Sequence, residues 1–279
     1  MSSGISVVMN TLNAQEWLEF SLRSVRSWVD EIVVVDMHSE DRTVEIALSH
    51  GARVLTHERS GYVEPARAFA VGQATGPWVL ILDADELVPA PLSRTLCEIV
   101  AADQHQAARI SRLNYFFGSP MRYAGWGLTT ERHLRFFKRG AVEFSDRIHE
   151  PTRPSPGTTV ADLPARAELS ILHFNYLDTS QFIERLNRYT TVEAKTWLER
   201  GNSIRAVSAV GQALRELGAR YLRFGGFRDG WRGAFVSLAM LFYRVAAYAK
   251  WRELSTAGPR EQVVERYRKE AERLLSEYP

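Results

Sequence analysis

Residues 78–86 (WVLILDADE) constrain the fold more than any other segment of the chain. The first five are apolar and partly β-branched, which is typical of a strand that is buried on both faces. Three carboxylates then follow within four residues: Asp83, Asp85 and Glu86. Carboxylates avoid burial unless they are paired or bound to a cation. Ligands of open α/β sheets bind at the carboxyl ends of the strands. The segment therefore predicts a sheet strand that ends at a polar site.

Two interpretations of these carboxylates stay open. On an extended backbone, Asp83 and Asp85 would point to the same side of the chain. Two such oxygen donors suit Mg²⁺ or Mn²⁺ shared with substrate phosphates. The alternative is a strand followed by an acidic helix N-terminus, with Pro89 opening the helix and Glu86 near its cap.

Length and composition exclude several classes of protein. A chain of 279 residues with 45% hydrophobic and 24% charged residues is long and apolar enough to fold around its own core. The net charge of +2 is too small for the surface as a whole to attract nucleic acid. The single cysteine, Cys97, excludes an internal disulfide and a multi-cysteine zinc site. The first residues lack the pattern of a secretory signal, so we expect a cytoplasmic protein.

Strand and helix patterns alternate in the first half, which predicts βαβ units and a parallel sheet. Strands are expected at residues 5–9, 31–35, 53–55 and 78–82, and helices at 16–28, 43–50 and 65–73. Two later strands, 109–117 and 133–138, indicate a mixed sheet. After Asp178 the chain is expected to be mostly helical.

Polar residues follow three of these strands. Strands that end at one edge of a sheet bring such residues to a common crevice. For the acids Asp36, Asp83 and Asp85 the pattern favours ligand binding. Residues such as Ser39 and Thr43 also cap helices or close turns, and for these both interpretations stay open. The full set is Thr11, Asn13, Glu16, Asp36, Ser39, Asp41, Thr43, Asp83, Asp85 and Glu86.

Several motifs together resemble the family 2 glycosyltransferases, and more narrowly the bacterial lipopolysaccharide core β-glucosyltransferases. They are residues 7–16 (VVMNTLNAQE), 35–43 (VDMHSEDRT), 59–67 (RSGYVEPAR) and 82–86 (LDADE), with FFK at 136–138 leading to IHE at 148–150. The resemblance covers about residues 5–190. It departs at Ala68, where many relatives have Asn after the arginine that matches Arg67.

The resemblance implies a GT-A fold, a Rossmann-like mixed and mainly parallel sheet flanked by helices. It places a nucleotide-sugar-binding and catalytic domain at residues 1–180 and a helical C-terminal extension at 181–279. The implied reaction is metal-dependent transfer of a hexose, with inversion, from a nucleotide sugar such as UDP-glucose. The acceptor would be a hydroxyl of a glycan or of a lipid-linked molecule such as lipopolysaccharide core, and the metal would be Mg²⁺ or Mn²⁺.

The resemblance also implies roles for single residues. Thr11 and Asp36 would hold the nucleobase, and Arg67 would place a positive charge near the phosphates. Asp83 would contact ribose or metal, and Asp85 would ligate the divalent ion. The full expected donor site is Thr11, Asn13, Glu16, Asp36, Ser39, Arg67, Asp83, Ala84 and Asp85.

The acceptor hydroxyl needs a base, and residues 146–150 offer three candidates. Glu150 is favoured over Asp146, and His149 could serve as the base or as a further metal ligand. His173 is a weaker candidate ligand. The alternative is that residues 146–150 form only a solvated loop.

Residues 220–232 interleave arginines with aromatic residues, and an apolar helix is expected at 234–249. That helix is short and contains Arg244, which suits the surface of an anionic membrane rather than a span. The chain would then lie peripherally on the inner face of the plasma membrane. The alternative is burial against the domain or in a homo-oligomer, and nucleic-acid binding ranks third.

Several rival functions can be weighed. A nucleotidyltransferase would need a Gly-rich basic loop, which is absent between Asn10 and Trp17. Nicotinamide enzymes and P-loop NTPases would need glycine motifs that the sequence lacks. A catalytically inactive sugar-nucleotide-binding relative, or a membrane scaffold, stays open as the alternative function.

Overall fold

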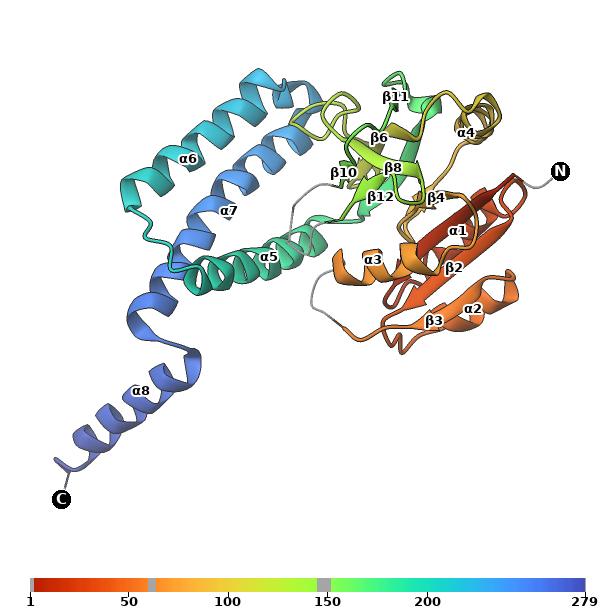
Figure 1. Cartoon of the computed structure of the whole chain (residues 1–279). Coiled ribbons are helices and arrows are strands. Elements are labelled where there is room, and N and C mark those ends of the chain that lie inside the picture. Colours follow the sequence, from red (N-terminus) through yellow and green to blue (C-terminus); the bar gives the residue numbers. More distant parts are fainter. Residues whose placement is uncertain (1–2, 60–63, 145–151, 279) are drawn as a thin grey trace. The chain divides into compact units, whose positions relative to one another are not determined.

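The computed structural model describes residues 3–59, 64–144 and 152–278, and the chain divides into two compact units (Figure 1). The first unit comprises Met1–Arg122 and Trp126–Asn175. The second comprises Tyr123–Gly125 and Tyr176–Pro279. The first unit contains the sheets, and the second is built mainly of helices.

Four parallel strands form one side of the main sheet, in the order β3-β2-β1-β4. A helix joins each strand to the next along the chain, which confirms the predicted βαβ units. The strands are β1 (Ile5–Thr11), β2 (Glu31–Asp36), β3 (Arg53–Thr56) and β4 (Trp78–Ile81). The helices are α1 (Leu18–Val25), which is shorter than predicted, α2 (Thr43–Ser49) and α3 (Glu64–Gln73).

Beyond β4 the sheet becomes antiparallel, because β8 pairs in that sense with both β4 and β6. The order continues β4-β8-β6-β12-β5, so the predicted mixed sheet is confirmed. The remaining elements of this unit are β5 (Glu86–Leu87), α4 (Ala90–Ala102), β6 (Ala107–Phe116), β7 (Ser119–Pro120), β8 (Arg132–Lys138), β9 (Val142–Glu143), β10 (Arg153–Pro154), β11 (Val160–Asp162), η1 (Ala167–Leu169) and β12 (Ser170–Tyr176).

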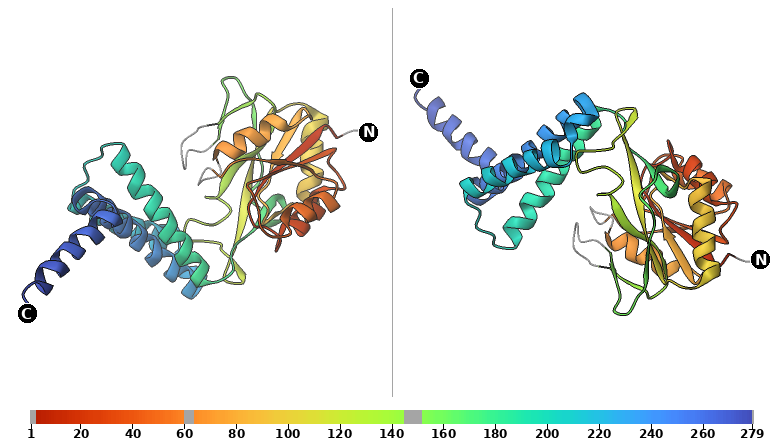
Figure 2. Two further views of the ribbon diagram at one scale, coloured as in Figure 1. Left: turned by 90° about the horizontal axis from the view of Figure 1, so that it is seen from below. Right: turned by 90° about the horizontal axis from the view of Figure 1, so that it is seen from above.

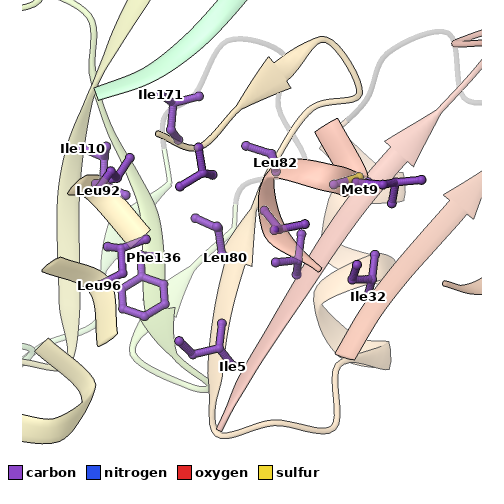
Figure 3. Packing of buried hydrophobic residues seen from close by; sticks show 14 of the residues in the cluster. Ile5, Met9, Ile32, Leu80, Leu82, Leu92, Leu96, Ile110, Phe136 and Ile171 are labelled. Atoms are coloured by element: carbon purple, nitrogen blue, oxygen red, sulfur yellow. The ribbon is translucent and has the colours of Figure 1, made fainter. Parts of the chain in front are cut away.

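The sheet is buried on both faces, as its apolar strands predict. Successive residues of a strand point to opposite faces, and in β1 Val7 and Val8 belong to different core clusters. Leu22 of α1 and Leu92 of α4 pack in the cluster of Val7, which Figure 3 shows in part. Ala70 of α3 packs in the cluster of Val8. Helices therefore cover both faces and leave the strand ends free to build a site.

The second unit confirms the helical C-terminal region, and Figure 2 shows its helices from two further sides. Its elements are α5 (Thr179–Glu199), α6 (Ala206–Gly218), η2 (Ala219–Arg223), η3 (Gly226–Asp229), α7 (Gly230–Ala257) and α8 (Arg260–Leu275). Lys250 of α7 joins α7 to α5 by donating to the carbonyl of Asn187 at 2.6 Å and to the Thr190 hydroxyl at 2.8 Å. Within the described ranges, none of the helices combines the length and apolar character needed to cross a bilayer.

Candidate active site

The carboxylate of Asp36 lies at the end of β2 and is almost fully buried, at 3% exposure. Its Oδ1 accepts hydrogen bonds from the Thr11 hydroxyl at 2.9 Å and the Ser39 hydroxyl at 2.6 Å. Its Oδ2 accepts one from the Ser39 backbone N–H at 2.8 Å. An ionised carboxylate has about four acceptor positions. One position on Oδ2 therefore stays available for a further N–H donor.

The loop after β1 is fastened to the loop after β2 by Asn13. Its backbone N–H donates to the Ser39 hydroxyl at 2.8 Å, and its side-chain oxygen accepts from the Glu40 N–H at 2.8 Å. Asn13 has φ = +49°, a left-handed conformation that Asn tolerates well. Asp41 accepts from the Thr43 N–H at 3.0 Å. These side chains therefore close turns, and their expected part in donor binding stays a prediction; Glu16 lies exposed outside this cluster.

Asp83 is held between two arginines from different elements. Its Oδ1 accepts from Arg67 of α3 and its Oδ2 from Arg135 of β8, each at 2.9 Å. Burial alone would raise the pKa of the Asp83 carboxyl, but the charges of Arg135 and Arg67 hold that pKa well below its ordinary value. Asp83 is thus a fixed anion whose two oxygens both have strong donors.

The backbone of residues 83–86 is a turn, so the expected extended geometry is wrong. The Glu86 N–H donates to the Asp83 carbonyl at 3.0 Å, and the Asp83 N–H donates to Glu86 Oε2 at 2.9 Å. Glu86 is fully buried in β5 instead of capping a helix. Its Oε1 lies 3.4 Å from both Arg112 and Arg135. Ala84 packs against the core beneath the turn.

Asp85 faces His173, which the sequence indicated only weakly. Asp85 Oδ2 lies 3.5 Å from His173 Nε2, and the Phe174 N–H donates to the Asp85 carbonyl at 3.0 Å. The other ring nitrogen, Nδ1, lies 2.7 Å from the Asn114 side-chain oxygen. When Nδ1 donates its proton to that oxygen, Nε2 presents a lone pair toward Asp85, which is the arrangement found in metal-binding histidines.

This pair fits a divalent cation shared with a substrate. Two adjacent ligands of an octahedral ion, each at about 2.1 Å, lie about 3 Å apart, which is close to the observed separation. In the part of the chain that the structure covers, no three His, Cys, Asp or Glu side chains gather as a metal cluster. A divalent ion bound here would have Asp85 and His173 among its ligands, and phosphate oxygens and water suit its other positions. The expected ligand His149 lies outside the described residues.

A second polar network was not predicted from the sequence. Arg112 of β6 donates to Glu131 at 2.7 Å, and the ring of His133 lies 3.1 Å from the same oxygen. Burial would raise the pKa of Glu131, but bonds from His133 and Arg112 lower it to about 2. Arg135, which pairs with Asp83, could have been noticed in the sequence, because this charged residue interrupts the apolar residues of β8.

The predicted site residues form three groups in the structure. Thr11, Asp36 and Ser39 lie with Asn13, Arg67 lies with Asp83, and Asp85 lies with His173. The candidate base residues Asp146, His149 and Glu150 lie outside the described residues.

The chain belongs to glycosyl transferase family 2, whose model matches residues 6–151. Its curated relatives include an uncharacterised glycosyltransferase of Rickettsia typhi, 26% identical over 90% of this chain and 87% of that protein. They also include the lipopolysaccharide core biosynthesis glycosyltransferase LpsC of Rhizobium meliloti, 27% identical over 88% of this chain and 94% of that protein. The chain is a glycosyltransferase, as the sequence predicted.

The chain is also similar to proteins of known structure, with low TM-scores. S. aureus TarS is 14% identical over 91% of this chain and 90% of the other, with a TM-score of 0.47. Glucosyl-3-phosphoglycerate synthase of Mycobacterium tuberculosis, solved with Mn²⁺, UDP-glucose and phosphoglyceric acid, is 27% identical over 39% of this chain and 43% of the other, with a TM-score of 0.34.

Proposed function

We propose that this glycosyltransferase transfers a hexose, with inversion, from a UDP-hexose such as UDP-glucose, and that it needs Mg²⁺ or Mn²⁺. The acceptor would be a hydroxyl of a glycan or lipid-linked molecule of the lipopolysaccharide core type. Family membership and the relative LpsC support the reaction class and the acceptor class. The observation that carries the proposal is the pair Asp85 and His173, with Asp85 in the turn that follows β4 and His173 on β12.

The base of the nucleotide would bind at Asp36. Thr11 and Ser39 hold this carboxylate in one orientation, and its remaining acceptor position suits the N–H of a uracil ring. Asn13 fixes the loop around it, and Glu16 would border the site from its exposed turn.

Asp85 and His173 would hold the divalent ion, which neutralises charge on the departing diphosphate when it is bound. Arg67 would add a second positive charge near the phosphates. Asp83 would act as a positioning residue, because both of its oxygens are already used by guanidinium groups. It would keep Arg67 oriented and the 83–86 turn in place.

The acceptor hydroxyl must lose its proton as the new bond forms, so a base is required. Glu150 remains our first candidate, with Asp146 and His149 as the alternatives. Glutamate suits this role when its carboxylate is free to accept a proton near neutral pH.

The proposal is tested by incubating the protein with UDP-, GDP- and ADP-hexoses and Mn²⁺, and by following slow hydrolysis of the donor. We expect hydrolysis of a UDP-hexose by the wild type and by the control Asp162→Ala, whose carboxylate is exposed on β11. Asp85→Ala should lose hydrolysis and metal-dependent UDP binding while keeping its fold. A wild type that binds UDP and hydrolyses no donor would favour the inactive, sugar-nucleotide-binding alternative.

A further inference from the structure

Helix α7 has apolar residues on two opposite faces. One face is buried and includes Val236 and Ala247. The other is exposed and carries Trp231, Leu238 and Phe242, spaced by seven and four residues and hence in one stripe. An exposed apolar stripe next to charged residues is typical of a surface that binds a partner or a membrane.

Helix α6 runs beside α7 and repeats this pattern (Figures 1 and 2). Ala209 and Ala213 are buried, whereas Val207, Val210 and Leu214 are exposed at a spacing of three and four residues. Val207 is 79% exposed. We call α6, α7 and the connecting residues 219–229 the α6–α7 hairpin. It presents apolar stripes from both helices.

Apolar and cationic side chains lie together in the connection between the two helices and at the start of α7. Phe227 is 50% exposed and Trp231 is 56% exposed. The guanidinium of Arg228 lies 5.6 Å from the Phe227 ring centre, and that of Arg232 lies 5.1 Å from the Trp231 ring. Arg223, next to the exposed Leu222, adds a further cation. Aromatic residues beside arginines suit the boundary between lipid headgroups and acyl chains.

The hairpin has more basic than acidic residues. Between residues 206 and 257 the basic residues are Arg215, Arg220, Arg223, Arg228, Arg232, Arg244, Lys250 and Arg252, and the acidic residues are Glu216, Asp229 and Glu253. Glu216 is paired with Arg220 at 2.6 Å, and Asp229 accepts from the Tyr123 N–H at 2.8 Å. Glu216 and Asp229 are therefore engaged within the unit, and so are Arg220, by Glu216, and Arg244, by Glu193 at 3.2 Å. The hairpin offers an excess of positive charge beside its apolar stripes.

We propose that the α6–α7 hairpin docks on the surface of an anionic lipid bilayer. The apolar stripes would enter the headgroup boundary, and the arginines would contact anionic headgroups. A second copy of the chain is a poorer partner, because two surfaces with the same excess of positive charge repel each other. This proposal does not depend on the identity of the sugar donor, and its test has a separate readout.

The test is co-sedimentation of the full chain with vesicles. We expect binding to vesicles of phosphatidylglycerol and phosphatidylcholine at low salt, little binding to pure phosphatidylcholine, and release at high salt. Arg223→Gln with Arg228→Gln should lower the partition coefficient about 25-fold, at about fivefold per cation. Trp231→Ser should also weaken binding. Each variant should keep its circular dichroism spectrum and donor hydrolysis.

Matched controls separate the hairpin from general charge and apolarity. Arg268→Gln with Lys269→Gln removes two cations from α8, and Leu48→Ser removes an exposed apolar side chain from α2. Both should bind vesicles as the wild type does. The proposal is overturned if the wild type stays in solution with anionic vesicles at low salt, or if the α8 control loses as much binding as the hairpin variant. It is also overturned if Leu238→Glu converts a vesicle-free dimer to a monomer, because the stripes would then pair two copies.

Discussion

Asp83 and Arg135 should show a large coupling free energy in the stability of the protein. The Arg135 nitrogen lies 2.9 Å from Asp83 Oδ2, and the side chains are only 9% and 27% exposed. Two unit charges about 4 Å apart attract by about 4 kcal/mol at an effective dielectric constant of about 20. Desolvation removes part of this gain. We expect a coupling free energy of about 2–3 kcal/mol.

A double-mutant cycle with Asp83→Asn and Arg135→Met, followed by urea unfolding, measures this coupling. Each single variant should lose about 3 kcal/mol of stability, at the lower end for a broken buried pair, because Asp83 keeps Arg67 and Arg135 keeps Glu86 as a partner. The pair Arg109 and Asp162 is the matched control, since its atoms also lie 2.9 Å apart but its side chains are 36% and 53% exposed. Its coupling should be about 0–1 kcal/mol. Equal coupling in the two cycles would refute the argument that burial makes Asp83 a fixed anion.

Three further predictions follow from the site. The pKa of Glu131 is about 2 in the fold against 4.5 ordinarily, so its stabilisation is present above pH 4.5 and is lost as the pH falls toward 2. Acid unfolding followed by circular dichroism should therefore be steeper in the wild type than in Glu131→Gln, and equal slopes would contradict this. His173→Ala should weaken Mn²⁺-dependent UDP binding by about 10–100-fold in calorimetry. The control His105→Ala should not weaken it, and an unchanged affinity in His173→Ala would remove His173 from the site. Glu150→Gln should keep UDP binding and slow transfer by about 10²-fold or more. A near-wild-type rate in a transfer assay would move the base to Asp146.

The strands of the first unit could be predicted because their sequences have the apolar pattern of strands buried on both faces. Residues 33–35 are all valine and are buried in the sheet, which only a strand with both faces covered explains. Asp36 ends that run, so its place at a strand end was predictable too. The candidate site residues Thr11 and Ser39 are close to Asp36 because β1 and β2 are neighbouring parallel strands, as the βαβ pattern predicts.

The partners contributed by the antiparallel half were harder to predict. Arg135 reaches Asp83 because β8 pairs with β4, and Asn114 reaches His173 because β6 and β12 are neighbours. These pairings join residues separated by 52 and 59 positions, with no local pattern to set the register. Arg135 also donates to the buried Glu86, and Glu86 in turn holds the 83–86 turn. Long-range contacts therefore decided a local backbone geometry that the motif alone suggested to be extended.

The three carboxylates of the 83–86 turn are alike in the sequence, and the acceptor positions left on each oxygen separate them. Glu86 is fully buried and shared by two arginines and a backbone N–H. Asp83 gives both oxygens to guanidinium groups. Asp85 faces the imidazole ring of His173 instead of a guanidinium group, and it keeps oxygen positions that a cation can use. A metal ion competes poorly with two buried arginines for the same oxygen, so we expect Asp85 to be the metal ligand of this motif. Glu86 and Asp83 would instead hold the turn that orients Asp85.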